Sequence, residues 1–350
     1  MSGNGPFTER CQTVLETLTT SHRALLTGSC THALDMAALL LDAEPGDEVI
    51  VPSFTFVSSA NAFASRRLAP VFADCRPDTL NLDVRELPRL LTPRTRAIVA
   101  MHYGGVACEM EAVTDFARAH GLTVIEDNAH GLFAKYKGRP LGSFGRLATQ
   151  SFHETKNVTC GEGGALLVND PALADRAAIV LEKGTNRRRF LRGEVDKYTW
   201  VDLGSNFMPS ELQAAYLWAQ LAAWPEIQQR RHAIWARYHA ELAAWADAQG
   251  VTQPTVPADC EHPAHLYFVL MPTEQARRRL IDHLKSLGIL AVFHYVPLHL
   301  SPMGRRFGGA PGACPVTERI SDRLVRLPFY ADLSAADQDD VIDAVQRFRV

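Results

Sequence analysis

Short apolar runs alternate with amphipathic segments along the first half of the chain, from about residue 25 to residue 170. The runs cover residues 48–52, 69–74, 96–102, 123–127 and 164–170. Between two of them, apolar residues recur at helical spacing at Met110, Val113, Phe116 and Ala117, which predicts a crossover helix. This alternation is typical of βαβ units, so we expect an α/β fold with a mostly parallel sheet.

The pattern changes after residue 209. Apolar spacing there predicts helices at residues 209–221 and 225–250, a strand at 266–270 and a helix at 275–287. Each of the first two helices has a proline near its start, a position that tolerates a missing backbone N–H. We therefore expect a large α/β domain over residues 1–225. A long linking helix and a smaller α+β domain follow over residues 226–350.

Composition narrows the class of protein. Of 350 residues, 36 are basic and 39 acidic, and the net charge of −3 favours neither nucleic acid nor an anionic membrane as a partner. The seven cysteines are scattered without CxxC pairs, which disfavours a disulfide framework or a metal site and suits a reducing cytoplasm. No apolar stretch is long enough to span a membrane, and the first residues do not resemble a signal peptide. We expect a cytoplasmic protein.

Lys156 carries the chemistry of the candidate site. It lies in an irregular turn between two apolar strands, with Ser151 before it and a glycine-rich return after it. An amine in such a turn is placed to form an imine, and pyridoxal phosphate is the aldehyde that this chemistry suggests. Asp127, at the carboxyl end of a predicted buried strand, can keep the pyridine nitrogen of that cofactor protonated.

Two further segments favour the same cofactor. Residues 27–34 lead into an apolar helix, whose N-terminus with serine and threonine hydroxyls is available for a phosphate. Residues 52–56 follow a strand and place aromatic side chains where a flat ring could stack. Each feature alone has an ordinary explanation, namely a capped helix, a core phenylalanine, a solvated lysine or a capping aspartate. Their combination favours a site for pyridoxal phosphate.

Several motifs resemble a known family. These are residues 126–131 (EDNAHG), 151–157 (SFHETKN), 161–164 (GEGG) and 206–215 (NFMPSELQAA). They are similar to the sugar aminotransferases of the DegT/DnrJ/EryC1/StrS family, and the likeness runs from about Phe7 to Phe348. The resemblance implies the aspartate aminotransferase fold (fold type I), with a mostly parallel, seven-stranded type of sheet and a smaller C-terminal domain.

Within that family, the chain looks most similar to dTDP-4-amino-4,6-dideoxygalactose transaminases. The narrower likeness lies in residues 106–110, 182–187, 195–200, 215–221 and 292–299. Two features depart from the family pattern. The chain starts late, so a leading helix near the site is expected to be missing, and Met208 stands where the wider family often has arginine.

The resemblance also implies roles for individual residues. Lys156 would be the Schiff-base lysine and proton shuttle, and Asp127 would pair with the pyridine nitrogen. The expected cofactor contacts are Phe56 on the ring, His130 near the phenolic oxygen, and Cys30, Thr31 and Ser151 at the phosphate. Asn206 would reach the phosphate of a neighbouring subunit, so the expected active unit is a homodimer with shared active sites.

The expected substrates are L-glutamate and a nucleotide-linked 4-keto-6-deoxy sugar such as dTDP-4-keto-6-deoxy-D-glucose. Arg187 belongs to the densest basic cluster of the chain and suits a diphosphate, although a solvated loop explains it equally well. Tyr295 and His299 lie in a proline-containing loop that is expected to approach the substrate; turn packing is the alternative.

Three other functions stay open at this point. A 3-keto-sugar aminotransferase of the same family would use the same site. A pyridoxal phosphate-dependent sugar dehydratase is less consistent with the sequence, because histidine replaces the lysine in relatives that dehydrate. A non-catalytic sugar-nucleotide-binding protein would not require Lys156 and Asp127 together.

Overall fold

A seven-stranded sheet lies at the centre of the molecule in the computed structural model, which describes residues 4–350. The strand order is β1-β9-β8-β5-β4-β2-β3. The strands are β1 (Arg23–Thr27), β2 (Glu48–Pro52), β3 (Ala69–Ala73), β4 (Thr95–Met101), β5 (Thr123–Asp127), β8 (Leu147–Ser151) and β9 (Gly164–Val168). Neighbours from β8 to β3 pair in parallel, and β1 and β9 are antiparallel to their neighbours. The predicted mostly parallel α/β sheet is confirmed.

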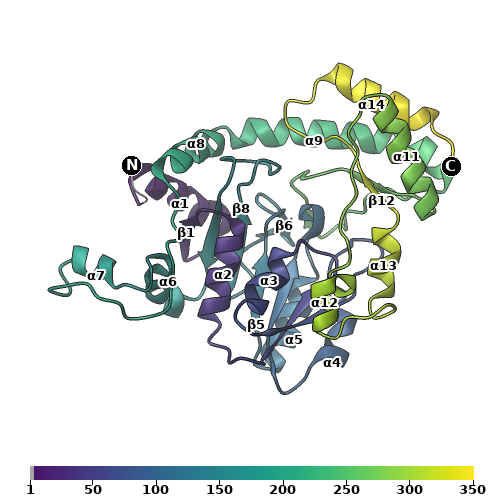
Figure 1. The fold of residues 1–350 in the computed structure, drawn as a ribbon. Helices are drawn as coiled ribbons and strands as arrows, with labels where there is room; N and C mark the ends of the chain where they lie inside the picture. The colour runs from purple at the N-terminus through teal and green to yellow at the C-terminus, as the bar shows by residue number, and fades with distance from the viewer. Residues whose placement is uncertain (1–3) are drawn as a thin grey trace.

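Helices cover both faces of this sheet (Figure 1). One face packs against α2 (Cys30–Leu40), α3 (Ser58–Ala64) and α6 (Ala174–Leu181). The other packs against α4 (Leu87–Leu90), α5 (Met110–Ala119), α1 (Pro6–Thr19) and α8 (Glu211–Ala222). The strands are therefore buried on both sides, which explains why they are apolar throughout instead of alternating with polar residues.

Helix α8 begins at Glu211, two residues after the predicted start at Pro209. The Ser210 side chain accepts a hydrogen bond from the Gln213 backbone N–H, and the Gln213 side chain accepts one from the Ser210 N–H. This capping box satisfies two groups that would otherwise be unpaired at the start of the helix. It fixes the point at which the chain leaves the segment around Asn206 and enters α8.

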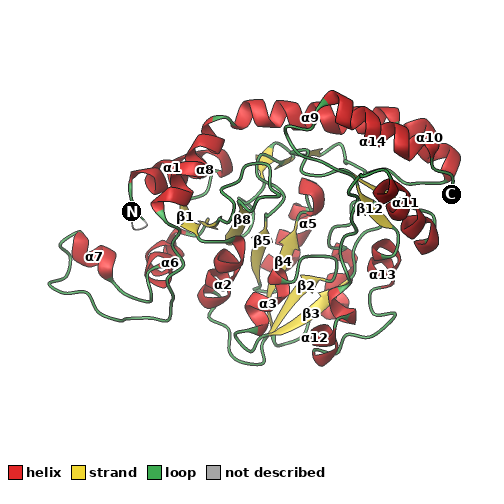
Figure 2. Cartoon of the chain, turned by 45° about the horizontal axis from the view of Figure 1, so that its top comes forward, coloured by secondary structure: helices red, strands yellow, loops and turns green. Residues whose placement is uncertain are grey.

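The smaller C-terminal part is built on α9 (Trp224–Glu241) and α14 (Ala335–Arg347), which lie side by side along one edge of the molecule (Figure 2). It also contains α10 (Ala243–Gln249), α11 (Glu274–Ser286), β11 (Phe268–Leu270) and β12 (Leu324–Arg326). The single helix predicted for residues 225–250 is interrupted at Leu242. The turn lets Trp245 of α10 pack inward and donate a hydrogen bond from Nε1 to the Phe348 carbonyl, 3.0 Å away.

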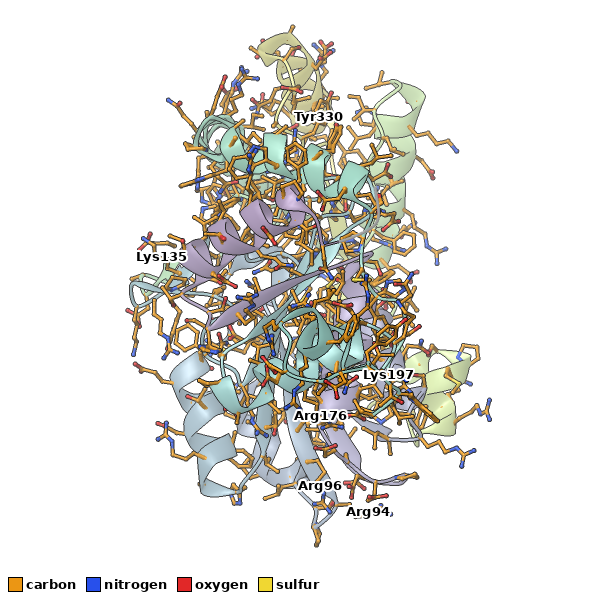
Figure 3. The ribbon with its side chains drawn as sticks, turned by 90° about the vertical axis from the view of Figure 1, so that its left-hand side faces the viewer. Arg94, Arg96, Lys135, Arg176, Lys197 and Tyr330 are labelled. Carbon is orange, nitrogen blue, oxygen red and sulfur yellow. The ribbon has the colours of Figure 1, made fainter. Side chains whose placement is uncertain are left out.

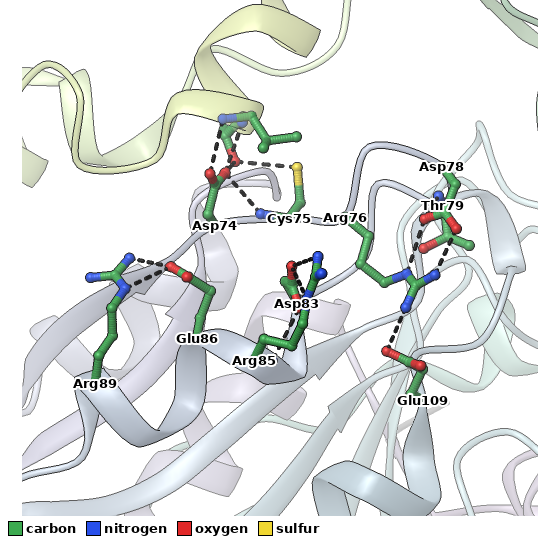
Figure 4. Close-up of polar contacts among 12 residues, drawn as sticks. Asp74, Cys75, Arg76, Asp78, Thr79, Asp83, Arg85, Glu86, Arg89 and Glu109 are labelled. Carbon is green, nitrogen blue, oxygen red and sulfur yellow. Dashed lines mark hydrogen bonds and ion pairs between the residues drawn. The ribbon is translucent and has the colours of Figure 1, made fainter.

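The last third of the chain also returns to the large domain. The predicted boundary at residues 225/226 lies in the first turn of α9. Three segments after it pack beside β2 and β3, namely η4 (Leu298–Leu300), α12 (Pro302–Arg306) and α13 (Pro315–Ser321). The Leu298 N–H donates to the Ser53 carbonyl at 3.0 Å. Asp74, after β3, accepts from the Val316 and Thr317 N–H groups at the start of α13 (Figure 4).

A small three-stranded sheet makes a further connection. Its strands are β6 (Lys135–Tyr136), β7 (Arg139–Pro140) and β10 (Cys260–Glu261), in the order β10-β6-β7. Strand β10 comes from the C-terminal part of the chain, and β6 and β7 belong to the large domain. The two parts are thus joined at several points besides α9.

Candidate active site

The candidate site lies where β5 and β8 end. These strands pair in parallel with Asp127 opposite Thr149, so their carboxyl ends open on the same edge of the sheet. Asp127 is the last residue of β5 and Ser151 is the last residue of β8. Lys156 lies in the loop after β8, where its backbone N–H donates to the His153 carbonyl at 2.9 Å. This is the edge at which α/β sheets bind ligands.

The Asp127 carboxylate is buried and held by two donors. Ser59 Oγ donates to Oδ2 at 2.5 Å, and the Ala129 N–H donates to Oδ1 at 3.2 Å. Ser59 Oγ also lies 2.8 Å from Thr55 Oγ1, so the hydroxyl is itself fixed. A buried carboxylate oriented in this way suits a protonated ring nitrogen as its partner.

Lys156 shares this environment. Burial lowers the pKa of its amine to about 8, opposed by nearby Cys30 and Asp127 and assisted by the positive charge of Arg326. An ordinary lysine, with a pKa of about 10.4, is almost fully protonated near neutrality. A much larger share of the Lys156 amine is therefore neutral, and only the neutral amine can act as nucleophile or base.

This pKa predicts how the protein without cofactor captures pyridoxal phosphate. The rate of covalent attachment should rise about tenfold per pH unit below 8 and level off above it, because the neutral fraction of Lys156 then saturates. The measurement is attachment rate from pH 6 to 10, with Nα-acetyllysine as the control. A rate that still rises steeply from pH 9 to 10 would show that the lysine has an ordinary pKa.

His130 is buried beside the lysine. Its ring stacks on His265 with centroids 4.2 Å apart, and Nδ1 accepts a hydrogen bond from the Gly104 N–H at 3.2 Å. Burial first, and then the charges of Lys156 and His265, hold the His130 pKa well below its usual range. The neutral ring therefore carries its proton on Nε2, which leaves one donor available to a ligand oxygen.

The start of α2 forms a cradle that suits a phosphate. Ser29 Oγ caps the His32 N–H, and the N–H groups of Cys30 and Thr31 have no acceptor within residues 4–350. A Cβ on Gly164 would lie 2.4 Å from the Cys30 nitrogen, so only glycine allows β9 to approach the helix start this closely. The residues present thus fit pyridoxal phosphate, with a phosphate cradle, a lysine and a carboxylate in one place.

Other predicted residues lie on the surface. Phe56 is 56% exposed, and Asn206 is exposed beside the segment that carries α7 (Arg187–Leu191). The backbone of Asn206 forms an isolated antiparallel β-bridge with Glu182, and the Glu182 side chain has Oε2 3.6 Å from Arg187 Nη1. Figure 1 shows α7 extending away from the sheet. Both residues therefore lie next to Glu182, Asn206 through the backbone and Arg187 through an ion pair.

The segment that carries α7 is held against α6 at the point where it leads back to the large domain. Arg176 of α6 forms ion pairs with Asp202, at 2.7 Å, and with Asp42, at 2.6 Å. Figure 3 looks onto this side of the molecule and labels Arg176 and Lys197 there. The ion pairs hold the end of the segment close to α6, while α7 itself projects.

Tyr295 and His299 have different surroundings. The Tyr295 ring stacks on His294 with centroids 3.9 Å apart and lies edge-on to Tyr103, which itself packs against His130 of the site. Burial raises the pKa of the Tyr295 hydroxyl. His299 is fully buried, with Nδ1 2.6 Å from Ser53 Oγ and Nε2 2.9 Å from Glu318 Oε1. Because both ring nitrogens of His299 are occupied, the structure favours turn packing over substrate contact for this residue.

Sequence reasoning missed several residues of the site. Ser59 lies in the hydroxyl-rich stretch after β2, which offered a weak signal. His265 fixes Asn157, the residue after Lys156, through a 2.8 Å contact between Nδ1 and Oδ1. His265 and Arg326 are remote from Lys156 in the sequence and belong to no motif, so only the fold reveals them.

Two classes of feature are not found within the described part of the chain. No helix among residues 4–350 combines the length and the apolar character that crossing a membrane requires. No cluster of three or more His, Cys, Asp or Glu side chains in that range is arranged to hold a metal ion.

Comparison with known proteins identifies the same family that the sequence motifs resemble. The profile of the DegT/DnrJ/EryC1/StrS aminotransferase family matches residues 1–346. GDP-perosamine synthase of Caulobacter vibrioides is 35% identical over 331 residues, 93% of this chain and 86% of that protein. The dTDP-4-dehydro-2,3,6-trideoxy-D-glucose 4-aminotransferase of Saccharopolyspora spinosa is 33% identical over 324 residues, 91% of this chain and 82% of that protein.

A solved structure agrees in fold. The pyridoxal phosphate form of the putative sugar aminotransferase Spr1654 from Streptococcus pneumoniae superposes with a TM-score of 0.89. The match covers 99% of this chain and 91% of the other, at 25% sequence identity.

Proposed function

The chain belongs to the DegT/DnrJ/EryC1/StrS aminotransferase family, and we propose that it aminates C4 of a nucleotide-linked 4-keto-6-deoxy sugar. As a member of this family it is a pyridoxal phosphate-dependent sugar aminotransferase. The proposed donor is L-glutamate and the proposed acceptor is dTDP-4-keto-6-deoxy-D-glucose. The product would be a dTDP-4-amino-4,6-dideoxyhexose.

One observation carries this proposal: the buried Asp127 carboxylate and the Lys156 amine, with its lowered pKa, share one edge of the sheet. When bound, pyridoxal phosphate supplies an electron-poor ring that stabilises negative charge on the carbon bearing the transferred nitrogen. Asp127 would hold the proton on the ring nitrogen. In the first half of the reaction Lys156 Nζ would take the proton from the donor carbon and pass it to the cofactor carbon, and in the second half it would make the reverse transfer to C4 of the sugar. His130 would donate a hydrogen bond from Nε2 to an oxygen of the bound group.

The choice of C4 rests on relatives. The Saccharopolyspora spinosa enzyme is named as a 4-aminotransferase of a dTDP-linked 4-dehydro sugar, and it matches 91% of this chain. We transfer that position of amination to this chain. A 3-keto-sugar aminotransferase remains the second candidate, because Lys156 and Asp127 would serve both positions equally.

We propose a homodimer with shared active sites. Large apolar side chains are exposed around Asn206, and patches of this kind mark protein interfaces. They are Tyr198, Trp200, Val201, Leu203, Leu212 and Tyr216. A second copy on this surface would place Asn206 at its partner's cofactor phosphate, and would bring Arg187 to its partner's nucleotide sugar.

The described cysteines are all free, which supports our placement of the protein in the cytoplasm.

The direct test is incubation with L-glutamate and dTDP-4-keto-6-deoxy-D-glucose, followed by NMR of the product. We expect an amino group on C4, and the proton couplings give its galacto or gluco configuration. Parallel reactions with the 3-keto isomer and with the GDP-linked sugar test position and carrier. Amination of the 3-keto isomer alone would replace the proposed substrate by the second candidate, and loss of water without amination would indicate a dehydratase.

A further inference from the structure

His265 is a buried histidine whose proton can be placed from its neighbours. The Pro263 carbonyl can only accept hydrogen bonds, and it lies 2.7 Å from Asn157 Nδ2 and 3.1 Å from Gln228 Nε2. Both atoms must therefore be amide donors, which fixes the orientation of the two side chains. Asn157 Oδ1 then faces His265 Nδ1, 2.8 Å away. Because an amide oxygen only accepts, His265 carries a proton on Nδ1.

The other ring nitrogen of His265 is left as an acceptor. Burial first, and then the charges of Lys156 and Arg231, hold the His265 pKa well below its usual range, so the ring is neutral. A neutral imidazole with its proton on Nδ1 has a free lone pair on Nε2. This nitrogen has no hydrogen-bond partner among residues 4–350, although it is not sealed in the interior. The ring therefore offers an unused acceptor.

This acceptor belongs to the candidate active site. His265 and Lys156 line the same small cavity, together with His130 and Ser151. The His265 ring stacks on His130, which carries its own proton on Nε2 because Nδ1 accepts from the Gly104 N–H. The two stacked rings thus have opposite tautomers, so one offers a donor and the other an acceptor.

Helix α9 holds His265 in place through a strained turn. Ala264, the residue before it, is fully buried and has a φ of +47°, a conformation that is unfavourable for alanine. Arg231 of α9 maintains the turn, because its Nε donates to the Ala264 carbonyl at 3.0 Å and its Nη2 donates to the His265 carbonyl. Backbone strain that the surroundings maintain is concentrated at functional sites. The turn therefore suits a residue whose ring must be placed accurately.

Lys156 needs an acceptor when it carries the transferred proton. Its amine is then an ammonium group with three donors, which is costly in a buried site unless those donors are paired. Nζ makes no hydrogen bond to residues 4–350 in the structure. The Asp127 carboxylate already accepts from Ser59 and from the Ala129 N–H, and it is expected to face the ring nitrogen of the cofactor. His265 Nε2 is an acceptor of the same cavity that no other group uses.

We propose that His265 is a positioning residue for Lys156, whose amine donates a hydrogen bond to His265 Nε2 whenever it is not attached to the cofactor. This role rests on the proposed reaction, in which Lys156 moves a proton, and it does not depend on the sugar. The His265 ring is a far weaker base than the amine. It can therefore orient the amine without removing the proton that Lys156 must deliver.

Nitrogen NMR of the protein with isotope-labelled histidine tests this hydrogen bond directly. The apoprotein is loaded with pyridoxamine phosphate, which leaves the Lys156 amine free, and the His265 signals are those missing from His265→Asn. We expect a protonated Nδ1 and an unprotonated Nε2. The Nε2 signal should move in Lys156→Ala, because its donor is lost. A proton on Nε2, or an Nε2 signal that is the same with and without the lysine, would overturn the proposal.

Two substitutions separate the acceptor from the contact with Asn157. An asparagine side chain reaches about as far as Nδ1 of histidine, so His265→Asn keeps a donor for Asn157 and loses the acceptor. A glutamine side chain reaches about as far as Nε2, so His265→Gln does the reverse. The control is His22→Asn, which changes an exposed histidine before β1. Circular dichroism checks that each variant is folded.

We expect His265→Asn to slow the glutamate half of the reaction about 30-fold, the usual value of one hydrogen bond to a charged group. The isotope effect of deuterium at the α-carbon of glutamate should be undiminished, because proton transfer is the step that slows. His265→Gln should be slowed less, and His22→Asn should react at the wild-type rate. The opposite order, with His265→Gln slower than His265→Asn, would overturn the proposal and leave His265 only its contact with Asn157. If the wild type aminates no sugar, the proposed substrate fails, while the NMR signals and the glutamate half of the reaction still decide the role of His265.

Discussion

Replacing Lys156 with alanine should abolish aminotransfer while leaving the fold intact. The expected loss of turnover is on the order of 10^6-fold, because the side chain supplies the amine that attaches the cofactor and moves the proton. The residue is half-buried in a loop, so its removal should cost little core packing. Turnover with L-glutamate and the keto sugar is the measurement. A variant that keeps substantial activity would remove Lys156 from the mechanism.

A mixed dimer gives the control for this variant. Asn206→Asp places a carboxylate where a phosphate is expected, so it should also be inactive, by charge repulsion. If Asn206 serves the partner's cofactor, a dimer of one Lys156→Ala chain and one Asn206→Asp chain contains one site with both defects and one with neither. Activity should then return on subunit exchange, up to one working site per dimer. No recovery after verified exchange would mean that Asn206 acts within its own chain or has only a structural role.

The second large effect is expected for Asp127→Asn, which should lower the rate by about 10^2 to 10^4-fold. The ring nitrogen would lose the charge that keeps it protonated. The two donors around this position, Ser59 Oγ and the Ala129 N–H, also suit a carboxylate, and an amide would turn its NH2 group toward one of them. The measurement is the single-turnover rate of the glutamate half of the reaction.

A matched variant tests whether the effect comes from the carboxylate at the cofactor ring or from the loss of any one negative charge. Asp170→Asn changes an aspartate that follows β9 on the surface and pairs with Arg146, and it should react at the wild-type rate. Ser59→Ala should produce a smaller loss than Asp127→Asn, because the carboxylate remains but is held by one donor fewer. Near-native activity of Asp127→Asn would show that another group holds the ring nitrogen.

Local sequence patterns predict much of the fold and indicate the two central candidates of the site. The strands β2, β3, β4, β5 and β9 are continuous apolar runs because both faces of the sheet are covered, and such runs are readable without a structure. Asp127 and Lys156 are candidates in the sequence because the first ends a buried strand and the second lies in the loop after one. The positions of these residues follow from the strands themselves.

The remaining features depend on contacts between distant parts of the chain. Arg326 contacts His294, and His294 contacts Tyr103 just after β4, only because β12 and the loop with His294 fold back onto the large domain. His299 resembled a substrate contact in the sequence, but its neighbours Ser53 and Glu318 come from two other segments and occupy both of its ring nitrogens. The break at Leu242 likewise reflects packing of Trp245 on the C-terminus, which overrides an otherwise continuous helical pattern.

The return of the C-terminal segment to β2 and β3 affects the order in which the protein can fold. Ser53 and Asp74 find their partners His299 and Thr317 only 246 and 243 residues later in the chain. During synthesis, the amino-terminal sheet therefore emerges long before the residues that complete its edge. Contacts between residues so far apart in the sequence slow folding. Until the C-terminal segment has been made, the edge of the sheet at β2 and β3 is uncovered and can aggregate with other chains. We expect the large domain to stay incomplete until almost the whole chain has been made.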